Sequence, residues 1–266
     1  MAEISIPVLF GSAFDLSLLD FSFKDIKIYD IQSKEFEEYI SSLQPDALEH
    51  NFNFFREIIE KIHSAYEKRY AIVKREPRID YNADDIFNVH KFLLILFPSD
   101  LQIESIIVYD VDENFIQTSY MSSYDRRFID EYPGDLLIVL DNKIPEINEF
   151  AQSYFDGLNA DNYIGITIEN YIMSFYSSHL HYQYLTLCIA LESVIYGNYE
   201  LTYRLRRTIA VLCGGDKFNC QTIYSNLNKI YKLRSRIIHG EDYDMEMVKA
   251  YLKPLRAIVS SISFII

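Results

Sequence analysis

Two residues near the end of the chain have the side-chain types needed for chemistry on a phosphate. Arg234 and His239 lie five positions apart within the segment 232–240. An arginine can stabilise the negative charge that develops on a phosphate, and a histidine can move a proton near neutral pH. The pair therefore indicates a reaction at a phosphodiester.

The residues before this segment predict a helix that turns Arg234 inward. Arg234 falls in register with a stripe of apolar residues at helical spacing, formed by Ile223, Leu227, Ile230 and Ile237. A guanidinium on an inward face is costly unless it meets an anion or a subunit interface. Glu192 is the only acid between residues 170 and 198, so a purely structural interpretation pairs Arg234 with Glu192.

His239 occupies the predicted last turn of the same helix, before Gly240. The carboxyl end of a helix favours a protonated imidazole. Residues five apart on an ideal helix point about 140° apart, so Arg234 and His239 do not share a face. Either the last turn deviates, or two copies of the segment meet across a symmetric dimer. Arg236, three positions before His239, shares its face better.

Charge is distributed unevenly along the chain. Residues 201–240 hold eight of the 25 basic residues and one of the 39 acidic residues, although the whole chain has a net charge of −14. Such a basic segment could hold a phosphate-rich ligand in an acidic protein. Alternatively, its cations pair with the acidic remainder of the chain.

The elements that must position these residues predict an α+β chain. Short apolar runs indicate strands at 4–10, 21–31, 103–111 and 136–140, with helices over 36–72 and from Asp84 to before Pro98. We therefore expect a mixed α/β domain at residues 1–143. From residue 144 the periods predict five helices, at 144–158, 162–196, 200–213, 221–238 and 244–264. They form an all-α bundle over residues 144–266.

Motifs for cofactors and metals are missing from the sequence. It contains no GxxxxGK[ST] loop, no GxGxxG after a strand, no CxxC pair and no HExxH. His179 and His181 lie in the predicted helix 162–196, where residues two apart point about 200° apart. We therefore expect neither a cofactor nor a bound metal.

The sequence also indicates where the protein works. Three cysteines follow an acidic start without a secretory signal, which is typical of reduced thiols in the cytoplasm. Residues 170–191 carry no Asp, Glu, Lys or Arg, but they hold too many polar groups for a membrane span. We expect no membrane contact, and a helix covered by other protein, such as a second subunit.

Four sequence blocks resemble the HEPN superfamily, most closely its Apea-like bacterial branch. They are Ala190–Ser193, Glu200–Arg206, Leu212–Gly214 and Ile230–Gly240, and their order and spacing are similar to that branch's pattern. The resemblance covers about residues 145–266 and leaves residues 1–140 unmatched. It implies a HEPN-like helical bundle that forms homodimers, in which two Arg-x4–6-His motifs build one composite site.

The resemblance also implies an activity, metal-independent endoribonuclease chemistry with Arg234 and His239 as catalytic residues. The RNA 2′-hydroxyl would attack the adjacent phosphorus and leave a 2′,3′-cyclic phosphate. Relatives cut tRNA or other RNA in antiviral abortive infection or toxin systems. The first domain would then be a sensor or regulator that meets a protein trigger or an antitoxin. Candidates for contact with RNA are Arg204, Arg206, Arg207, Lys232, Ser235 and Arg236.

Two other interpretations of the same residues stay open. The chain could hold a non-catalytic HEPN-like module that binds a nucleotide or a partner protein, or a helical interaction protein in which the motif is accidental. A solvent-accessible cleft with Arg234 and His239 from two chains favours the enzyme. Arg234 against Glu192, with His239 at the end of its own helix and distant from any partner copy, favours the module.

Overall fold

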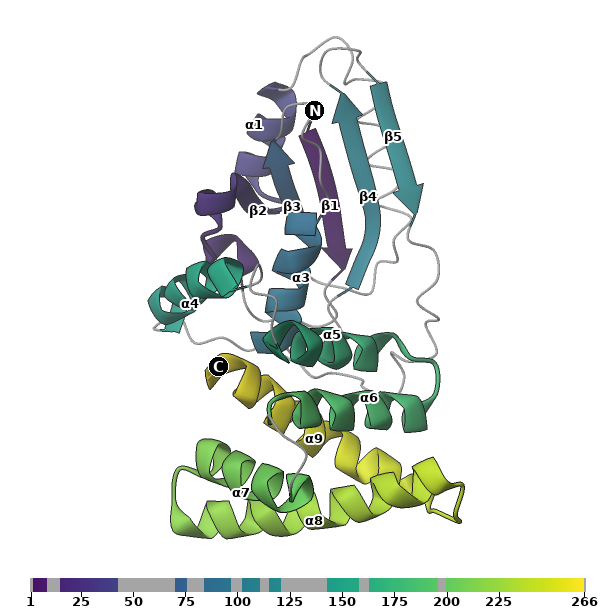
Figure 1. The fold of residues 1–266 in the computed structure, drawn as a ribbon. Coiled ribbons are helices and arrows are strands. Elements are labelled where there is room, and N and C mark those ends of the chain that lie inside the picture. Colours follow the sequence, from purple (N-terminus) through teal and green to yellow (C-terminus); the bar gives the residue numbers. More distant parts are fainter. Residues whose placement is uncertain are drawn as a thin grey trace. The chain divides into compact units, whose positions relative to one another are not determined.

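The computed structural model describes residues 2–8, 15–42, 70–75, 84–96, 102–110, 115–120, 143–157, 163–195 and 200–265. The chain divides into two compact units. The first unit comprises Met1–Leu93 and Ser99–Gly157, and the second comprises Leu94–Pro98 and Leu158–Ile266. The described part is rich in helix and holds one sheet, so helices and strands occur together as the sequence predicts (Figure 1). Helix 144–157, which the sequence assigns to the bundle, belongs to the first unit.

The sheet of the first unit is antiparallel and has the order β2-β3-β1-β4-β5 (Figure 1). Pro7 lies where the register between β1 and β4 shifts, which suits a residue that has no N–H to donate to the ladder. The strands are β1 (Ala2–Val8), β2 (Ile26–Asp30), β3 (Tyr70–Arg75), β4 (Gln102–Asp110) and β5 (Phe115–Tyr120).

Aromatic rings hold the helices of the first unit together. The ring of Phe92 lies 5.3–5.7 Å from the rings of Phe21, Phe150 and Tyr154, centroid to centroid. The described helices of this unit are α1 (Lys34–Ser42), α3 (Asp84–Leu96), whose last three residues belong to the second unit, and α4 (Ile144–Gly157), with the short turns η1 (Leu16–Leu18) and η2 (Ser22–Lys24).

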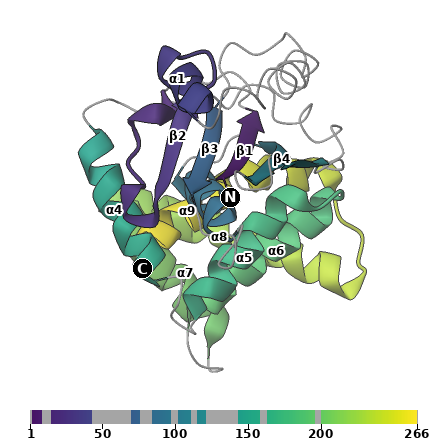
Figure 2. The same ribbon diagram turned by 90° about the horizontal axis from the view of Figure 1, so that it is seen from above.

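Two helical hairpins and a long last helix make up the described part of the second unit. The first hairpin pairs α5 (Tyr163–Tyr176) with α6 (Leu180–Ser193), which lie side by side (Figures 1 and 2). The second pairs α7 (Leu201–Gly214) with α8 (Lys217–His239), and α9 (Met245–Ile265) contacts α5, α6 and α7. Helix α9 buries an apolar stripe at spacings of three and four residues, namely Val248, Leu252, Leu255, Val259 and Ile262.

The turn between α7 and α8 depends on close approach. A Cβ atom on Gly214 would lie 2.5 Å from the Sγ atom of Cys220, so only glycine fits there without movement. Gly215 has a φ of +67°, a left-handed value that glycine adopts freely. Asp216 then caps α8 by accepting a hydrogen bond from the N–H of Asn219 at 2.9 Å.

The single helix predicted over residues 162–196 is wrong. The chain leaves the helix at Ser177 and begins α6 at Leu180. Two side chains bind carbonyl groups that the break frees. The guanidinium of Arg256 donates to the Ser174 oxygen at 2.7 Å, and the amide of Gln183 donates to the Ser177 oxygen at 2.9 Å. These tertiary bonds stabilise a break that helical periodicity does not reveal.

The helix predicted over residues 36–72 is also wrong at its end, because residues 70–75 form β3. Helix α1 covers only Lys34–Ser42, and residues 43–69 lie outside the described residues, as does the strand predicted at 136–140. The strand predicted at 21–31 begins at Ile26, after the turn η2. The strands near 4–10 and 103–111, the helix from Asp84, and the helices near 144–158, 200–213, 221–238 and 244–264 are confirmed to within four residues.

Candidate functional site

Arg234 forms an ion pair that joins α6 to α8. Its Nη2 atom donates to the Oε2 atom of Glu192 at 2.8 Å, and the two side chains are 28% and 21% exposed. Glu192 is the partner that the structural interpretation of the sequence offers. The half-buried position explains why an arginine occurs in an apolar stripe, since its charge is matched inside the same unit.

Neutral groups surround this ion pair. Burial raises the pKa of the Cys188 thiol and of the Tyr231 phenol, so both are protonated at neutral pH. Burial also raises the pKa of Glu192, although the charge of Arg234 acts against the rise. Within the described part of the chain, the Tyr231 hydroxyl and the Nε atom of Arg234 are buried and make no hydrogen bond. Arg234 therefore has donor capacity beyond its bond to Glu192.

His239 lies apart from Arg234 in the single chain. It is exposed in the last turn of α8, which Gly240 ends with a φ of +67° and N–H bonds back to the last turn. The helix is regular to that point, so the two side chains leave it about 140° apart. One chain therefore does not bring Arg234 and His239 onto one face.

The outward face of α8 carries three cations and a histidine. Lys229, Lys232, Arg236 and His239 are all exposed and follow one another at spacings of three, four and three residues. We call these four residues the basic stripe; Ser235 is exposed beside it. Among the described residues, no acidic side chain forms an ion pair with a residue of the stripe. Arg234 pairs internally, and the cations of the stripe face solvent.

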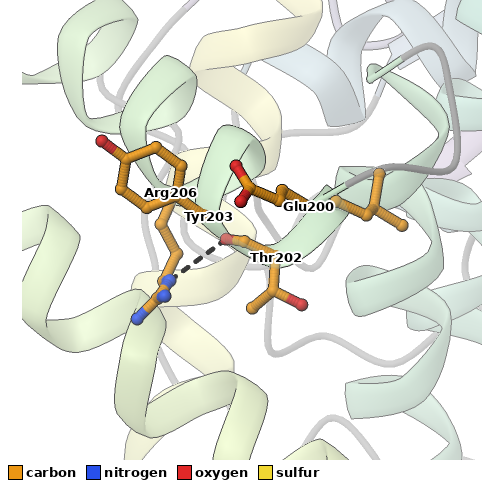
Figure 3. A pocket seen from close by; sticks show the side chains of 5 residues that line it. Glu200, Thr202, Tyr203 and Arg206 are labelled. Carbon is orange, nitrogen blue, oxygen red and sulfur yellow. Dashed lines mark hydrogen bonds between the residues drawn. The ribbon is translucent and has the colours of Figure 1, made fainter.

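The three arginines of α7 have different environments. Arg204 and Arg207 are exposed, whereas Arg206 is half-buried and its Nη1 atom donates to the Asn228 oxygen at 2.6 Å. Its Nε atom donates to the Thr202 main-chain oxygen at 3.1 Å, in a recess of about 450 Å³ (Figure 3). Its guanidinium also lies over the Tyr224 ring. Arg206 therefore joins α7 to α8, while Arg204 and Arg207 remain accessible to a ligand.

The hairpin of α5 and α6 exposes several large apolar side chains, and residues 170–191 carry no charge, although the exposed Glu169 lies between Ile166 and Met173 on α5. We call these exposed apolar side chains the apolar hairpin face; they are Tyr163, Ile166, Met173, Tyr182 and Ile189. Large apolar side chains gathered on one hairpin are typical of a surface that meets another protein. That this helix is covered by other protein, as the uncharged sequence suggests, stays a prediction.

His179 and His181 lie closer together than expected. Because the helix breaks before them, His179 precedes α6 and its ring stacks on that of His181 with centroids 5.5 Å apart. The expectation of opposite directions rested on a continuous helix and is wrong. Within the described residues, no three side chains of His, Cys, Asp or Glu are placed to share a metal ion. No described helix has the length and apolar character required to cross a bilayer.

Sequence reasoning missed three residues that the structure brings forward. Phe218 and Lys229 lie on the outward face of α8, and Arg256 is buried against Ser174 and Gln183. Arg256 could have been found by the same pattern as Arg234, since it lies four residues after Leu252 beside an apolar stripe.

The comparisons with protein families, with curated proteins and with solved structures give no match to this chain.

Proposed function

We propose that the second unit is a HEPN-like helical bundle that acts as a metal-independent endoribonuclease in a homodimer. The observation that carries the proposal is the basic stripe, which faces solvent, ends in His239 and lies on the helix that holds Arg234. Exposed cations without carboxylate partners attract a phosphate backbone, and an imidazole at their end can transfer protons.

The proposed reaction needs only the RNA and two side chains. The 2′-oxygen attacks the adjacent phosphorus as the bond from phosphorus to the 5′-oxygen breaks, giving a 2′,3′-cyclic phosphate and a 5′-hydroxyl. His239 accepts the 2′-hydroxyl proton or donates a proton to the leaving oxygen. Arg234 stabilises the charge on the phosphorane. DNA, which lacks the 2′-hydroxyl, is no substrate.

Glu192 acts as a positioning residue in this proposal. An arginine has five N–H groups in a rigid plane, and the bond at 2.8 Å to Glu192 engages one of them. The pair fixes the orientation of the guanidinium. Its Nε–H is buried, so a phosphate oxygen would be held by the remaining N–H groups of the two Nη atoms. The ion pair is thus compatible with a catalytic role of Arg234.

A second copy of the chain supplies the missing proximity. The apolar hairpin face includes Ile189, one helical turn before Glu192 on α6. A copy that docks there lies beside the ion pair of Arg234 and can offer its own His239. We infer that the dimer forms through this face and that the first unit regulates it, in a bacterial antiviral or toxin system in the cytoplasm.

Mixing two inactive variants tests the composite site. Arg234→Ala and His239→Ala are each expected to lose RNA cleavage in EDTA by at least about 100-fold. Each dimer has two composite sites, and each site takes Arg234 from one copy and His239 from the other. A mixed dimer keeps one site with both residues intact, so mixing restores up to half of the wild-type rate in those dimers. Lys249→Ala, on α9, is the control that keeps wild-type activity. Two active variants, or a mixture that stays inactive although mixed dimers form, would contradict the composite site.

A non-catalytic HEPN-like module that binds a nucleotide or a partner protein is the second candidate, favoured by the pairing of Arg234 with Glu192. It predicts that the wild type leaves RNA intact, even where it binds the strand. It also predicts that Arg234→Ala lowers stability more than RNA affinity. Cyclic-phosphate ends produced by the wild type and absent with His239→Ala exclude this candidate.

A further inference from the structure

Phe218 is the most exposed of the large apolar side chains in the described part of the chain. It lies in the first turn of α8 with 75% of its surface open to solvent. Steps of seven residues lead from Phe218 through Ser225 and Lys232 to His239, and all four side chains are exposed. Phe218 therefore lies on the same face of α8 as the basic stripe.

A shallow recess of about 270 Å³ adjoins this ring. Its lining residues all lie on α8, and the Thr222 hydroxyl among them already donates to the Phe218 main-chain oxygen at 3.0 Å. They are Phe218, Gln221, Thr222, Ser225 and Asn226. A nucleobase is planar and stacks on an aromatic ring, and carboxamides can both donate to and accept from its polar edge. No charged side chain lines the recess, which suits a neutral base better than a phosphate.

The recess and the cations lie in series along one helix. With a rise of about 1.5 Å per residue, Phe218 is about 16 Å from Lys229 and about 27 Å from Arg236 along the axis. At the spacing of about 3.4 Å per nucleotide found in one strand of B-form DNA, about eight stacked nucleotides span the distance. A duplex would hide the faces of its bases, whereas a single strand can place one base on Phe218.

We propose that the recess at Phe218 is a nucleobase-binding subsite for single-stranded RNA, whose phosphates follow Lys229, Lys232 and Arg236. This inference rests on the proposed function and names its substrate as an unpaired strand of about eight nucleotides. The subsite lies at the opposite end of α8 from His239, so it holds the strand at a distance from the proposed reaction.

Binding of a 2′-O-methyl RNA, which the reaction cannot cleave, tests the subsite. Fluorescence anisotropy with a twelve-nucleotide strand is measured for the full chain and its variants. Removal of a stacking ring costs about 5- to 100-fold in affinity, so Phe218→Ala and Phe218→Leu are expected to bind that much more weakly, while Phe218→Trp keeps the wild-type affinity. Leu18→Ala, an exposed apolar position in the first unit, is the control with unchanged affinity.

Salt and length separate stacking from charge. Phe218→Ala leaves the slope of log Kd against log salt unchanged, whereas Lys232→Ala reduces it by about 0.7. A stacked strand of three nucleotides is too short to reach from Phe218 to the cations. When such a strand binds at the cations, Phe218→Ala does not change its affinity. A twelve-base-pair duplex shows no loss with Phe218→Ala.

Each outcome decides a different claim. A wild type that binds the strand and a Phe218→Ala variant that binds it equally well overturn the subsite and leave the proposed function standing. Equal affinity of Phe218→Leu and Phe218→Trp shows that binding does not need an aromatic ring at this position and overturns the subsite too. No binding by the wild type at low salt overturns both the subsite and the proposed function.

Discussion

The two faces of α8 place the same kind of side chain in opposite surroundings. Arg234 is half-buried and bonded to Glu192, whereas Arg236, two residues later, is exposed without an ion pair to any described residue. The two differ in position by about 200° around one helix. Burial makes a carboxylate partner necessary for Arg234, and exposure leaves Arg236 available to an anion from outside.

The basic segment of residues 201–240 is therefore not one functional surface. The inward cation contributes to the packing of α6 on α8 and, in the proposed reaction, to catalysis. The outward cations, in the same proposal, bind the RNA phosphates. Four experiments test this division, and they follow in order of decreasing effect.

The close turn at Gly214 sets how α8 begins after α7. Gly214→Ala is expected to lower the free energy of unfolding by about 2–3 kcal/mol, because the new Cβ would lie 2.5 Å from the Sγ atom of Cys220 and 2.8 Å from its main-chain nitrogen. Gly165→Ala on α5 is the matched control, since no atom lies within 4 Å of its added Cβ. It is expected to gain about 0.5–1 kcal/mol through helix propensity. Urea unfolding measures both, and equal effects would contradict the packing at Gly214.

The arginines themselves give the most direct comparison. Arg234→Met is expected to lower the free energy of unfolding by about 2 kcal/mol, less than for a fully buried pair, because Glu192 loses its partner. Arg236→Met should change it by less than about 0.5 kcal/mol. The double variant Arg234→Met with Glu192→Gln should recover most of the loss. A double variant as unstable as the sum of both single variants would show that the pair does not act as a unit.

The outward face is tested through salt. Lys229→Ala and Arg236→Ala are each expected to weaken RNA binding several-fold and to reduce the salt slope by about 0.7, while the unfolding free energy stays within about 0.5 kcal/mol of the wild type. Anisotropy titrations at several salt concentrations measure the slope. Unchanged salt slopes would show that these two side chains do not contact the RNA phosphates. Lys253→Ala on α9 is the control with an unchanged slope.

The contribution of the inward face to the free energy of unfolding depends on pH. Burial raises the pKa of Glu192 above its ordinary value of 4.5, and Arg234 partly offsets the rise. A carboxyl with a higher pKa in the folded state gains stability by taking up a proton, so its contribution grows as pH falls through the folded pKa and is lost as pH rises through it. The free energy of unfolding of the wild type relative to Glu192→Gln should therefore increase as the pH falls from neutral toward the ordinary carboxyl pKa of 4.5. A difference that decreases on acidification would show that the ion pair dominates over burial.

Much of the candidate site follows from short-range pattern. The spacing of Ile223, Leu227 and Ile230 predicts the inward position of Arg234, and the scarcity of acids in 170–198 identifies Glu192 as its partner. The helix end at Gly240 and the exposure of Arg236 and His239 follow from the same periodicity. These features depend on residues within a few turns of one another, which the sequence displays directly.

Local sequence pattern thus predicts most of the amphipathic helices of residues 144–266 and the inward and outward sides of α8. Tertiary structure alone decided the break at Ser177–His179, where Arg256 and Gln183 bind carbonyl oxygens. It also decided the strand at 70–75 and the exposure of Phe218. The physical reason is that a backbone break or strand depends on partners distant in sequence, whereas a helical face repeats every few residues along the chain.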